Sequence, residues 1–437
     1  MHWQSRRQLA VVLGVGFLIG GLVTPALGGD IGPGTEFAVA RPNHGAIRQI
    51  ADLRSSGRHE EAALIKAMIE TPHAEWYTQG TPKTVMQDVR NDVNRAAAKG
   101  TVPVLVAYNI PFRDCAQFSA GGATSVDEYK AWIDGFAAGI GDHEVIVILE
   151  PDGLGIIPHY DPYAGADGSN ALEWCQPAEA DAATAAAERF EMLNYAVDAL
   201  KAQPNARVYL DGTHSAWLGV GDIAHRLLQA GVERADGFYL NASNYQFTSN
   251  SVQYGTWISS CLAIASTPEQ FVGCPNQYWN GGPLPAKIAV LLGEWTGVAL
   301  SPYGEWSDES DDPALNTSGL NLRYAGDLPT THFVVDTSRN GLGPWLPPAD
   351  RPAGDPQDWC NPPDRGLGLR PTADTGSALV DAYLWIKTPG ESDGQCNRWA
   401  PAGSVDPVRG IMNPPAGAWF PQQALELAEL AVPPLGD

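Results

Sequence analysis

The most informative segment for the architecture is Val145-Ile146-Val147-Ile148-Leu149-Glu150-Pro151-Asp152. Its first five residues form a continuous apolar run rich in β-branched side chains, which is typical of a strand buried on both faces of a parallel sheet. Two carboxylates follow where the strand ends. A helical pattern precedes the run at 126–140 and another follows at 180–202, so the stretch predicts a strand–helix unit with acidic residues at the carboxyl end of its strand.

The same alternation continues along most of the chain. Apolar periodicity and flanking breaker residues predict helices at 83–99, 126–140, 180–202 and 220–230. Short apolar runs predict strands at 102–108, 145–149, 208–210, 237–240, 288–292, 333–335 and 382–386. Many such units in one chain favour an α/β fold with a closed or nearly closed parallel barrel over an open sheet.

Polar residues follow the predicted strands, at the edge where a βα barrel carries its active site. They are Tyr108, Asp114, Glu150, Asp152, Asp211, His214, Asn241, Asn244, Asp336 and Asp393. Any one of them could simply cap a helix or a turn, as Asp and Asn commonly do. Together, in a chain with 14 Trp and 14 Tyr, they indicate an acid–base site.

Asp152 is the candidate general acid. Desolvation at the end of a buried strand disfavours the carboxylate and raises its pKa, so the protonated group can donate to a leaving oxygen, as glycoside hydrolysis requires. A charged Asp114 nearby would help to keep Asp152 protonated, although Asp114 could instead form a plain salt bridge with Arg113. Asp393 is the candidate second carboxylate, which an inverting enzyme holds roughly 6.5–9.5 Å from the acid with a water between them.

Three tryptophans, Trp76, Trp217 and Trp359, occur in polar, loop-like surroundings. The apolar face of a sugar ring can stack on an aromatic face while its hydroxyl groups bind polar neighbours, so these three are candidate sugar platforms. We expect most of the other tryptophans in the core. The formal net charge of −23 disfavours nucleic acid as a partner, whereas an uncharged sugar polymer is not repelled.

Residues 1–29 are predicted to be an export signal. Arg6 and Arg7 precede an uncharged apolar run at 9–23, and small residues follow it where a signal peptidase would cleave. The two arginines also resemble a twin-arginine signal. The alternative is an uncleaved membrane anchor, but the run is short for a bilayer span. We therefore predict a secreted protein without stable membrane association.

The remainder, residues 30–437, is predicted to be a single catalytic domain that acts as a monomer. No linker rich in Ser, Thr and Pro divides it, which disfavours a separate carbohydrate-binding module. The six cysteines, at 115, 175, 261, 274, 360 and 396, fit disulfide bonds in an exported chain, and their number allows 15 pairings. A metal site is the competing interpretation, but no C-x-x-C, H-x-H or H-E-x-x-H motif occurs, and we expect no metal and no cofactor.

Several segments resemble the inverting β-1,4-glucanases, or cellulases, of glycoside hydrolase family 6. The segment 148–154 resembles the one that carries the family's catalytic acid, and 108–115 resembles its N-x-P-x-R-D-C-type loop. The strand end 209–217 resembles its substrate-binding segment. The C-terminal segments that match in order are 358–362, 385–394 and 416–420. The resemblance runs from about Ala74 to the end of the chain.

The resemblance implies a distorted barrel with about seven parallel strands and long loops on the carboxyl face, and β-1,4-glucan as the substrate. In that family's scheme Asp152 would be the general acid, Asp114 would tune it and help to organise the water, and Asp393 resembles the proposed general base. Tyr108 would press on the distorted sugar at the cleavage point. With the strand-end residues Asn241 and Asn244, the predicted substrate-binding set is Trp76, Asp211, His214, Trp217, Trp359, Lys387 and Glu391. The implied disulfides are Cys115–Cys175 and Cys360–Cys396, which leaves Cys261 and Cys274 as a third pair.

Residues 246–331 form a predicted insertion that does not resemble the compact endo-acting members. It is expected either to narrow the cleft as a roof, with aromatics that meet the sugar chain, or to pack those aromatics into its own small core. These aromatics are Tyr254, Trp257, Trp279, Trp295 and Trp306. The sequence therefore leaves both endoglucanase and cellobiohydrolase action open.

Other functions are less consistent with the residues. A catalytically silent carbohydrate-binding protein on the same scaffold would keep the tryptophans and lose the acid, yet Asp152 and Asp114 are both present. A serine hydrolase of the nucleophile-elbow type needs a G-x-S-x-G motif, which the chain lacks. A dinucleotide enzyme needs G-x-G-x-x-G directly after a strand, which is also missing.

Overall fold

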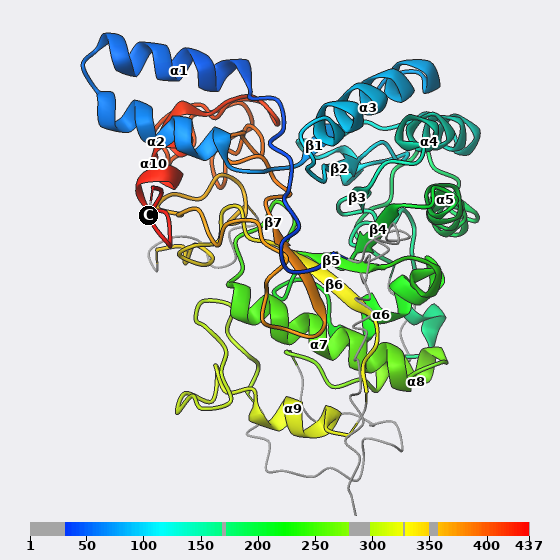
Figure 1. Cartoon of the computed structure of the whole chain (residues 1–437). Coiled ribbons are helices and arrows are strands. Elements are labelled where there is room, and N and C mark those ends of the chain that lie inside the picture. Colours follow the sequence, from blue (N-terminus) through cyan, green and yellow to red (C-terminus); the bar gives the residue numbers. More distant parts are fainter. Residues whose placement is uncertain (1–30, 168–171, 279–297, 327, 349–356, 437) are drawn as a thin grey trace, which may run out of the picture.

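A curled parallel sheet forms the centre of the molecule (Figure 1). The computed structural model describes residues 31–436 apart from 168–171, 279–297, 327 and 349–356. Seven parallel strands follow one another in sequence order across the sheet, which curls into a distorted half-barrel with helices around it. They are β1 (Glu75–Tyr77), β2 (Val104–Ala107), β3 (Val145–Leu149), β4 (Ala206–Asp211), β5 (Gly237–Leu240), β6 (His332–Asp336) and β7 (Val380–Leu384).

The helices of the barrel layer pack on the outer face of this sheet. They are α3 (Pro82–Ala97), α4 (Val126–Ile140), α5 (Ala185–Lys201), α6 (Val220–Gln229) and α7 (Thr248–Ile264), and the shorter α8 (Pro268–Val272) and α9 (Ser318–Tyr324) lie beside α6 and α7. Short 3₁₀ helices occupy Asp114–Ala116, Pro162–Gly165 and Val232–Arg234.

The predicted fold class is confirmed, and the predicted elements match with small differences. The helix predicted at 180–202 begins only at Ala185, and β7 lies two residues before the strand predicted at 382–386. The strand predicted at 288–292 lies outside the described residues. Strand β1 was not among the predicted strands, and Trp76, which was expected in a loop, is the middle residue of that strand. Three residues are too few for a periodic pattern to stand out.

Strand β3 shows why its sequence is apolar throughout. Its five residues are all buried. Val147 and Leu149 pack into the core between the sheet and the helices, whereas Ile146 and Ile148 pack into the interior of the barrel. Because side chains alternate along a strand and both faces of this sheet are covered, every position must be apolar.

The two edges of the sheet approach each other without pairing as strands. No ladder joins β7 to β1 within the described residues. Instead the Ala74 N–H donates to the Trp385 carbonyl at 2.9 Å, and the Trp76 indole N–H donates to the Ile386 carbonyl at 2.8 Å. These two bonds hold the segment that follows β7 against the first strand.

A second, smaller core supports this segment from outside. Helices α1 (His44–Ser55), α2 (His59–Glu70) and α10 (Pro421–Glu429) come from opposite ends of the chain and pack together (Figure 1). Trp385 and Trp419 are buried among their apolar side chains. The packing of the two chain ends therefore braces the segment after β7.

The insertion at 246–331 packs three of its aromatics into the core. Tyr254, Trp257 and Trp306 are buried, and the rings of Trp257 and Trp306 stack with their centroids 5.6 Å apart. The idea that these three meet a sugar chain is therefore wrong, since α7 supplies part of the helical layer over β6. Trp279 and Trp295 lie outside the described residues.

Three disulfide bonds join the pairs that the resemblance implied: Cys115–Cys175, Cys261–Cys274 and Cys360–Cys396. In the described part of the chain, none of the helices has the length and apolar character needed to cross a membrane. The predicted signal at 1–29 lies outside the described residues.

Candidate active site

A cleft of about 580 Å³ opens at the carboxyl ends of the strands. Ten of the thirteen predicted catalytic and substrate-binding residues line it: Trp76, Tyr108, Asp114, Asp152, His214, Trp217, Asn244, Trp359, Lys387 and Asp393. Except for Trp76 in β1, they come from the segments that follow β2 to β7. The parallel topology thus gathers residues up to about three hundred positions apart in the chain at one opening.

Asp152 stands on a sharp turn three residues beyond β3. Glu150 and Asp152 both have positive φ, 51° and 61°, and the Gly153 N–H donates back to the Glu150 carbonyl at 2.8 Å. A Cβ on Gly153 would lie 2.6 Å from that carbonyl oxygen, so the turn requires glycine there. The turn presents the Asp152 carboxyl to the cleft.

The surroundings of Asp152 favour its protonated form. Burial raises the pKa of the Asp152 carboxyl well above its usual range, and the neighbouring carboxylates of Asp211 and Asp114 raise it further. No described residue forms a hydrogen bond with this carboxyl. These effects favour the protonated carboxyl, the form that can give a proton to a leaving oxygen.

Asp211 holds the backbone directly after the Asp152 turn. Its carboxylate accepts the backbone N–H groups of Leu154 and Gly155, each at 3.1 Å, and that of Thr213 at 2.8 Å. Burial raises the pKa of Asp211 to about 6, although these three N–H groups lower it. Asp211 was predicted to bind substrate, but it does not line the cleft. Its carboxylate oxygens accept backbone N–H groups instead.

Asp114 lies on the loop after β2. Burial raises the pKa of Asp114 to about 6, opposed by the Ser119 N–H, which donates to it at 2.6 Å, and by the Arg113 guanidinium. No ion pair joins Asp114 to Arg113 among the described residues. The guanidinium donates instead to the backbone carbonyls of Thr78, Tyr108 and Ser119, and so shapes the loop.

Glu150 ties the Asp152 turn to the neighbouring loop. It is fully buried and accepts the backbone N–H groups of Asn109 and Ile110 at 2.9 and 3.0 Å. Burial raises the pKa of Glu150 to about 7, although these two bonds lower it. Glu150, the first residue of the Asp152 turn, therefore fixes the start of the loop that carries Asp114.

Arg189, which was not among the predicted site residues, makes a second connection between the same two loops. Its side chain, on α5, is buried and donates to the carbonyls of Gly153 and Ile156 at 2.8 and 2.7 Å, and to that of Pro111 at 2.8 Å. One guanidinium thus joins the Asp152 turn to the Asp114 loop. The signal was available: Arg189 lies on the same helical stripe as the buried Ala185 and Ala196, where a charged residue needs an explanation.

Asp393, on the opposite wall, is held by cationic and hydrogen-bonding groups. The Arg339 guanidinium contacts its two oxygens at 2.9 and 3.0 Å, and the Tyr245 hydroxyl donates to it at 3.1 Å. The Lys387 ammonium lies 3.8 Å away. The Asn361 N–H adds a further bond at 2.9 Å. These contacts stabilise a carboxylate anion.

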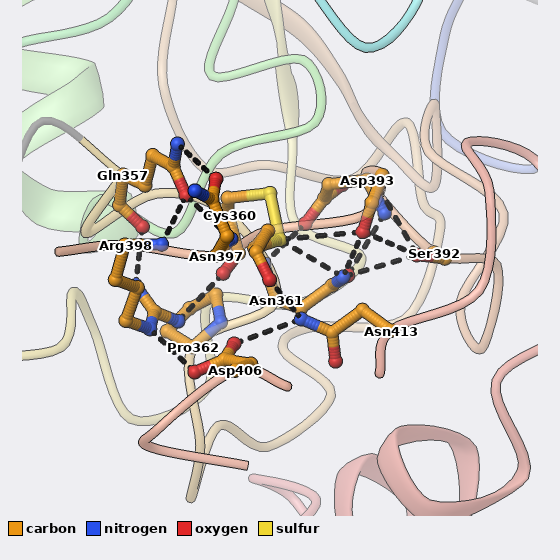
Figure 2. The surroundings of a disulfide bond; sticks show 12 residues. Gln357, Cys360, Asn361, Pro362, Ser392, Asp393, Asn397, Arg398, Asp406 and Asn413 are labelled. Carbon is orange, nitrogen blue, oxygen red and sulfur yellow. Dashed lines mark hydrogen bonds and ion pairs between the residues drawn. A yellow bond between two sulfur atoms is a disulfide. The ribbon is translucent and has the colours of Figure 1, made fainter. Parts of the chain in front are cut away.

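Asn361 connects this carboxylate to the segment that holds Cys360 and Pro362 (Figure 2). Its side-chain oxygen accepts the Asp393 N–H at 2.8 Å, and its amide nitrogen donates to Ser392 Oγ and to the Gly394 carbonyl. Its φ of 44° lies in the left-handed region, which Asn tolerates better than most residues. Asp393 and Trp359 are thereby placed relative to one another.

A buried ion pair between Arg398 and Asp406 supports the loop that holds Asn361 (Figure 2). The side chains of Arg398 and Asp406 are 0% exposed, and their Nε and Oδ1 atoms lie 3.2 Å apart. Arg398 also donates to the Cys360 carbonyl at 2.7 Å, beside the Cys360–Cys396 disulfide. Covalent and ionic contacts therefore fix the loop on both sides of Asn361.

The candidate sugar platforms are held by their own contacts. Trp76 and Tyr108 meet edge to face with centroids 5.6 Å apart, and the Lys387 ammonium lies 6.0 Å from the Trp76 ring centroid. The Trp217 ring lies so close to Gly155 that a Cβ there would be 2.4 Å from it. Burial lowers the pKa of His214 to about 3, so its ring is neutral. Its Nδ1 accepts the Ala216 N–H, which leaves Nε2 as the donor.

Two further predicted residues, Asn241 and Glu391, do not line the cleft. Asn241 is fully buried and donates to the Asp336 carbonyl at 2.9 Å, so it joins the ends of β5 and β6. Glu391 accepts a bond from Asn43 at 2.8 Å.

Several cleft residues were not among the predicted ones: Ser119, Trp174, Tyr245, Tyr303 and Trp345. They lie in loops, where no periodic pattern shows which side chains converge. Among the described residues, no group of three or more His, Cys, Asp or Glu side chains is arranged to hold a metal ion.

Comparison with known proteins agrees with this geometry. A sequence model of the family described as Glycosyl hydrolases family 6 matches residues 33–431. Endoglucanase A of Thermobispora bispora is 31% identical over 365 residues, which cover 83% of this chain and 56% of that protein, so the chain spans about half of that relative's length. The probable 1,4-β-D-glucan cellobiohydrolase C of Aspergillus niger is 29% identical over 393 residues. The match covers 85% of this chain and 71% of that protein.

A solved structure agrees as well. The endoglucanase Cel6 of Mycobacterium tuberculosis, in complex with methyl-cellobiosyl-4-deoxy-4-thio-β-D-cellobioside, aligns with a TM-score of 0.61 and 30% identity. The alignment covers 92% of this chain and 99% of that one.

Proposed function

Since this chain belongs to glycosyl hydrolases family 6, we propose that it is a secreted β-1,4-glucanase that cleaves internal bonds of its substrate with inversion at the anomeric carbon. The observation that carries the proposal is the state of Asp152. Its carboxyl is desolvated, lies beside two other carboxylates and lines the cleft, and the first two factors favour its protonated form. A positioned proton donor is what cleavage of an unactivated glycosidic bond requires.

In the proposed reaction, Asp152 transfers its proton to the glycosidic oxygen as the bond to the anomeric carbon breaks. A water molecule attacks that carbon from the opposite face, and its proton passes to Asp393, the general base. Asp114 keeps Asp152 protonated and helps to orient the water. Arg339 and Tyr245 keep Asp393 anionic, as a base must be before the reaction.

The glucan would lie along the aromatic side chains of the cleft. Trp76, Trp217 and Trp359 offer faces for stacking, and Tyr108 presses on the sugar at the cleavage point. His214, Asn244 and Lys387 bind hydroxyl groups. Asp211, Asn241 and Glu391 act indirectly, since they do not line the cleft.

Inversion is tested by proton NMR of the first products from soluble cellulose. We expect the α-anomer before mutarotation, because the water attacks opposite the departing oxygen. A β-anomer at the first observation would contradict the mechanism. A protein that binds the glucan and releases no reducing ends would instead be the catalytically silent carbohydrate-binding alternative.

Endo action is supported by the insertion and by the relatives. Among the described residues, the segment 246–331 contributes Gln246, Pro302 and Tyr303 to the cleft lining, whereas Tyr254, Trp257 and Trp306 are buried in the core. Identity is 31% to the endoglucanase and 29% to the cellobiohydrolase. We expect the viscosity of soluble cellulose to fall early, with little free cellobiose. Steady cellobiose release with slow loss of viscosity would show exo action.

Secretion is supported by the sequence of residues 1–29. N-terminal sequencing of the protein recovered outside its producing cells should begin just after this segment. An intact segment in the recovered protein would point to the membrane-anchor alternative.

A further inference from the structure

Trp174 is an exposed aromatic residue in the cleft wall that the proposed reaction does not use. Its side chain is 56% exposed, and it lines the same cleft as Asp152 and Trp217. Scattered apolar residues on a surface need no explanation, but a large indole at the edge of a ligand cleft is a place where binding removes apolar area from water.

The backbone on both sides of Trp174 is fixed. Cys175 is bonded to Cys115, the neighbour of Asp114. Glu173 donates its N–H to the Tyr160 carbonyl at 2.8 Å and accepts the Ile157 N–H at 3.2 Å. Its carboxylate also pairs with the buried guanidinium of Arg226. The indole is therefore exposed on a rigid support, so a ligand that stacks on it has little backbone to order.

Polar side chains accompany the indole in the cleft. Gln117 and Ser119, on the loop after the Cys115–Cys175 bridge, line the same opening. An aromatic face with hydrogen-bonding groups nearby suits a pyranose ring, which has apolar faces and a rim of hydroxyl groups.

We propose that Trp174 is an additional stacking platform for a glucosyl unit of a β-1,4-glucan chain, beyond those offered by Trp76, Trp217 and Trp359. The proposal rests on the proposed function, because it extends the same cleft by one more sugar. It makes Trp174 a specificity-determining residue: it favours long chains, which reach the indole, over short ones, which do not.

The test compares hydrolysis of soluble cello-oligosaccharides from cellotriose to cellohexaose by the wild type and Trp174→Ala. We expect kcat/KM for the longest substrate to fall roughly tenfold, a typical loss for one aromatic stacking contact, and kcat/KM for the shortest to stay unchanged. Trp174→Phe should restore most of the loss, because it restores a flat aromatic face. Trp174→Leu should not.

Leu172 provides the matched control. It lies two residues earlier on the same loop, is 47% exposed and does not line the cleft, so Leu172→Ala should leave every rate unchanged. An equal loss by Trp174→Ala at all chain lengths, or no loss at any length, would overturn the proposal.

A binding measurement separates this proposal from the proposed function. Calorimetry with cellohexaose is carried out on Asp152→Asn and on the double variant Asp152→Asn with Trp174→Ala. A roughly tenfold weaker affinity of the double variant supports the platform even if the wild type hydrolyses nothing. Equal affinities would overturn it even if the enzyme is active.

Discussion

On the wall of the cleft built after β2 and β3, the Asp152 carboxyl has no hydrogen-bond partner among the described residues, and other carboxylates lie near it. On the wall built after β6 and β7, Asp393 accepts bonds from the Arg339 guanidinium, the Tyr245 hydroxyl and the Asn361 N–H. Both groups line the same opening. The neighbours of the two aspartates therefore differ in kind: those of Asp152 disfavour its anion, whereas those of Asp393 are cationic or donate hydrogen bonds.

The two walls should respond differently to the loss of a carboxylate. Desolvation makes the charged form of Asp152 unfavourable, so removing this carboxyl relieves an unfavourable group. Removing Asp393 leaves the buried Arg339 guanidinium without its anionic partner. An uncompensated buried charge lowers the free energy of unfolding. Loss of Asp152 should therefore reduce activity without reducing stability, whereas loss of Asp393 should reduce both.

The largest effect is expected for Asp152→Asn. Loss of the general acid should lower kcat on soluble cellulose by roughly 10²–10⁴, while affinity for the glucan survives. The free energy of unfolding should not decrease, because the amide is neutral where the carboxylate is disfavoured. The checks are initial rates, binding of cello-oligosaccharides and urea unfolding. Wild-type turnover by the purified variant would remove Asp152 from the mechanism.

Asp393→Ala should instead destabilise the protein as well as inactivate it. We expect a loss of about 3–5 kcal/mol in the free energy of unfolding, because a buried guanidinium loses its partner. Adding Arg339→Met should recover part of this stability and none of the activity. If Asp393→Ala unfolds at the same urea concentration as the wild type, the contrast between the walls is lost.

Arg189→Met tests how the first wall is held together. The variant loses the bonds to the carbonyls of Pro111, Gly153 and Ile156, so we expect kcat to fall by about 10–100-fold with KM little changed, because the reacting groups are misplaced. Arg189→Lys should recover only part of the rate, since one ammonium cannot span the three carbonyls. If both variants keep the wild-type kcat and pH profile, Arg189 is not a positioning residue.

The smallest effect is expected in the pH dependence of Asp114→Asn. Burial raises the pKa of Asp114 from 3.8 to about 6, so the folded state binds a proton more tightly than the unfolded state. The contribution of this group to stability therefore falls as the pH rises from 3.8 to about 6, and the variant should lack that fall. Thermal unfolding across this range measures it. A slope equal to that of the wild type would contradict the assignment.

The same substitution should shift the rate profile. The Asp114 carboxylate raises the pKa of Asp152, so its removal should move the alkaline decline of kcat to lower pH. A shift to higher pH would mean that Asp114 acts on a different group.

The parallel sheet and the position of Asp152 could be predicted from the sequence, whereas strand β1 and the partners of Asp393 could not. Strand β3 is buried on both faces, so its apolar run predicted both the parallel sheet and the position of Asp152 at its end. The short strand β1 was missed because three residues carry no pattern. The contrast between Asp152 and Asp393 was also missed, since the partners of Asp393, Arg339 and Tyr245, come from distant segments that only the fold brings near.

The role of Asp152 as the proton donor is tested by comparing two kinds of substrate with the variant Asp152→Ala. Cellulose has a poor leaving group and needs a proton, whereas a cellobioside of 2,4-dinitrophenol has a leaving group that departs as an anion. We predict that the variant loses roughly 10²–10⁴ in kcat on cellulose and far less on the activated cellobioside. An equal loss on both substrates would show that Asp152 is not the proton donor.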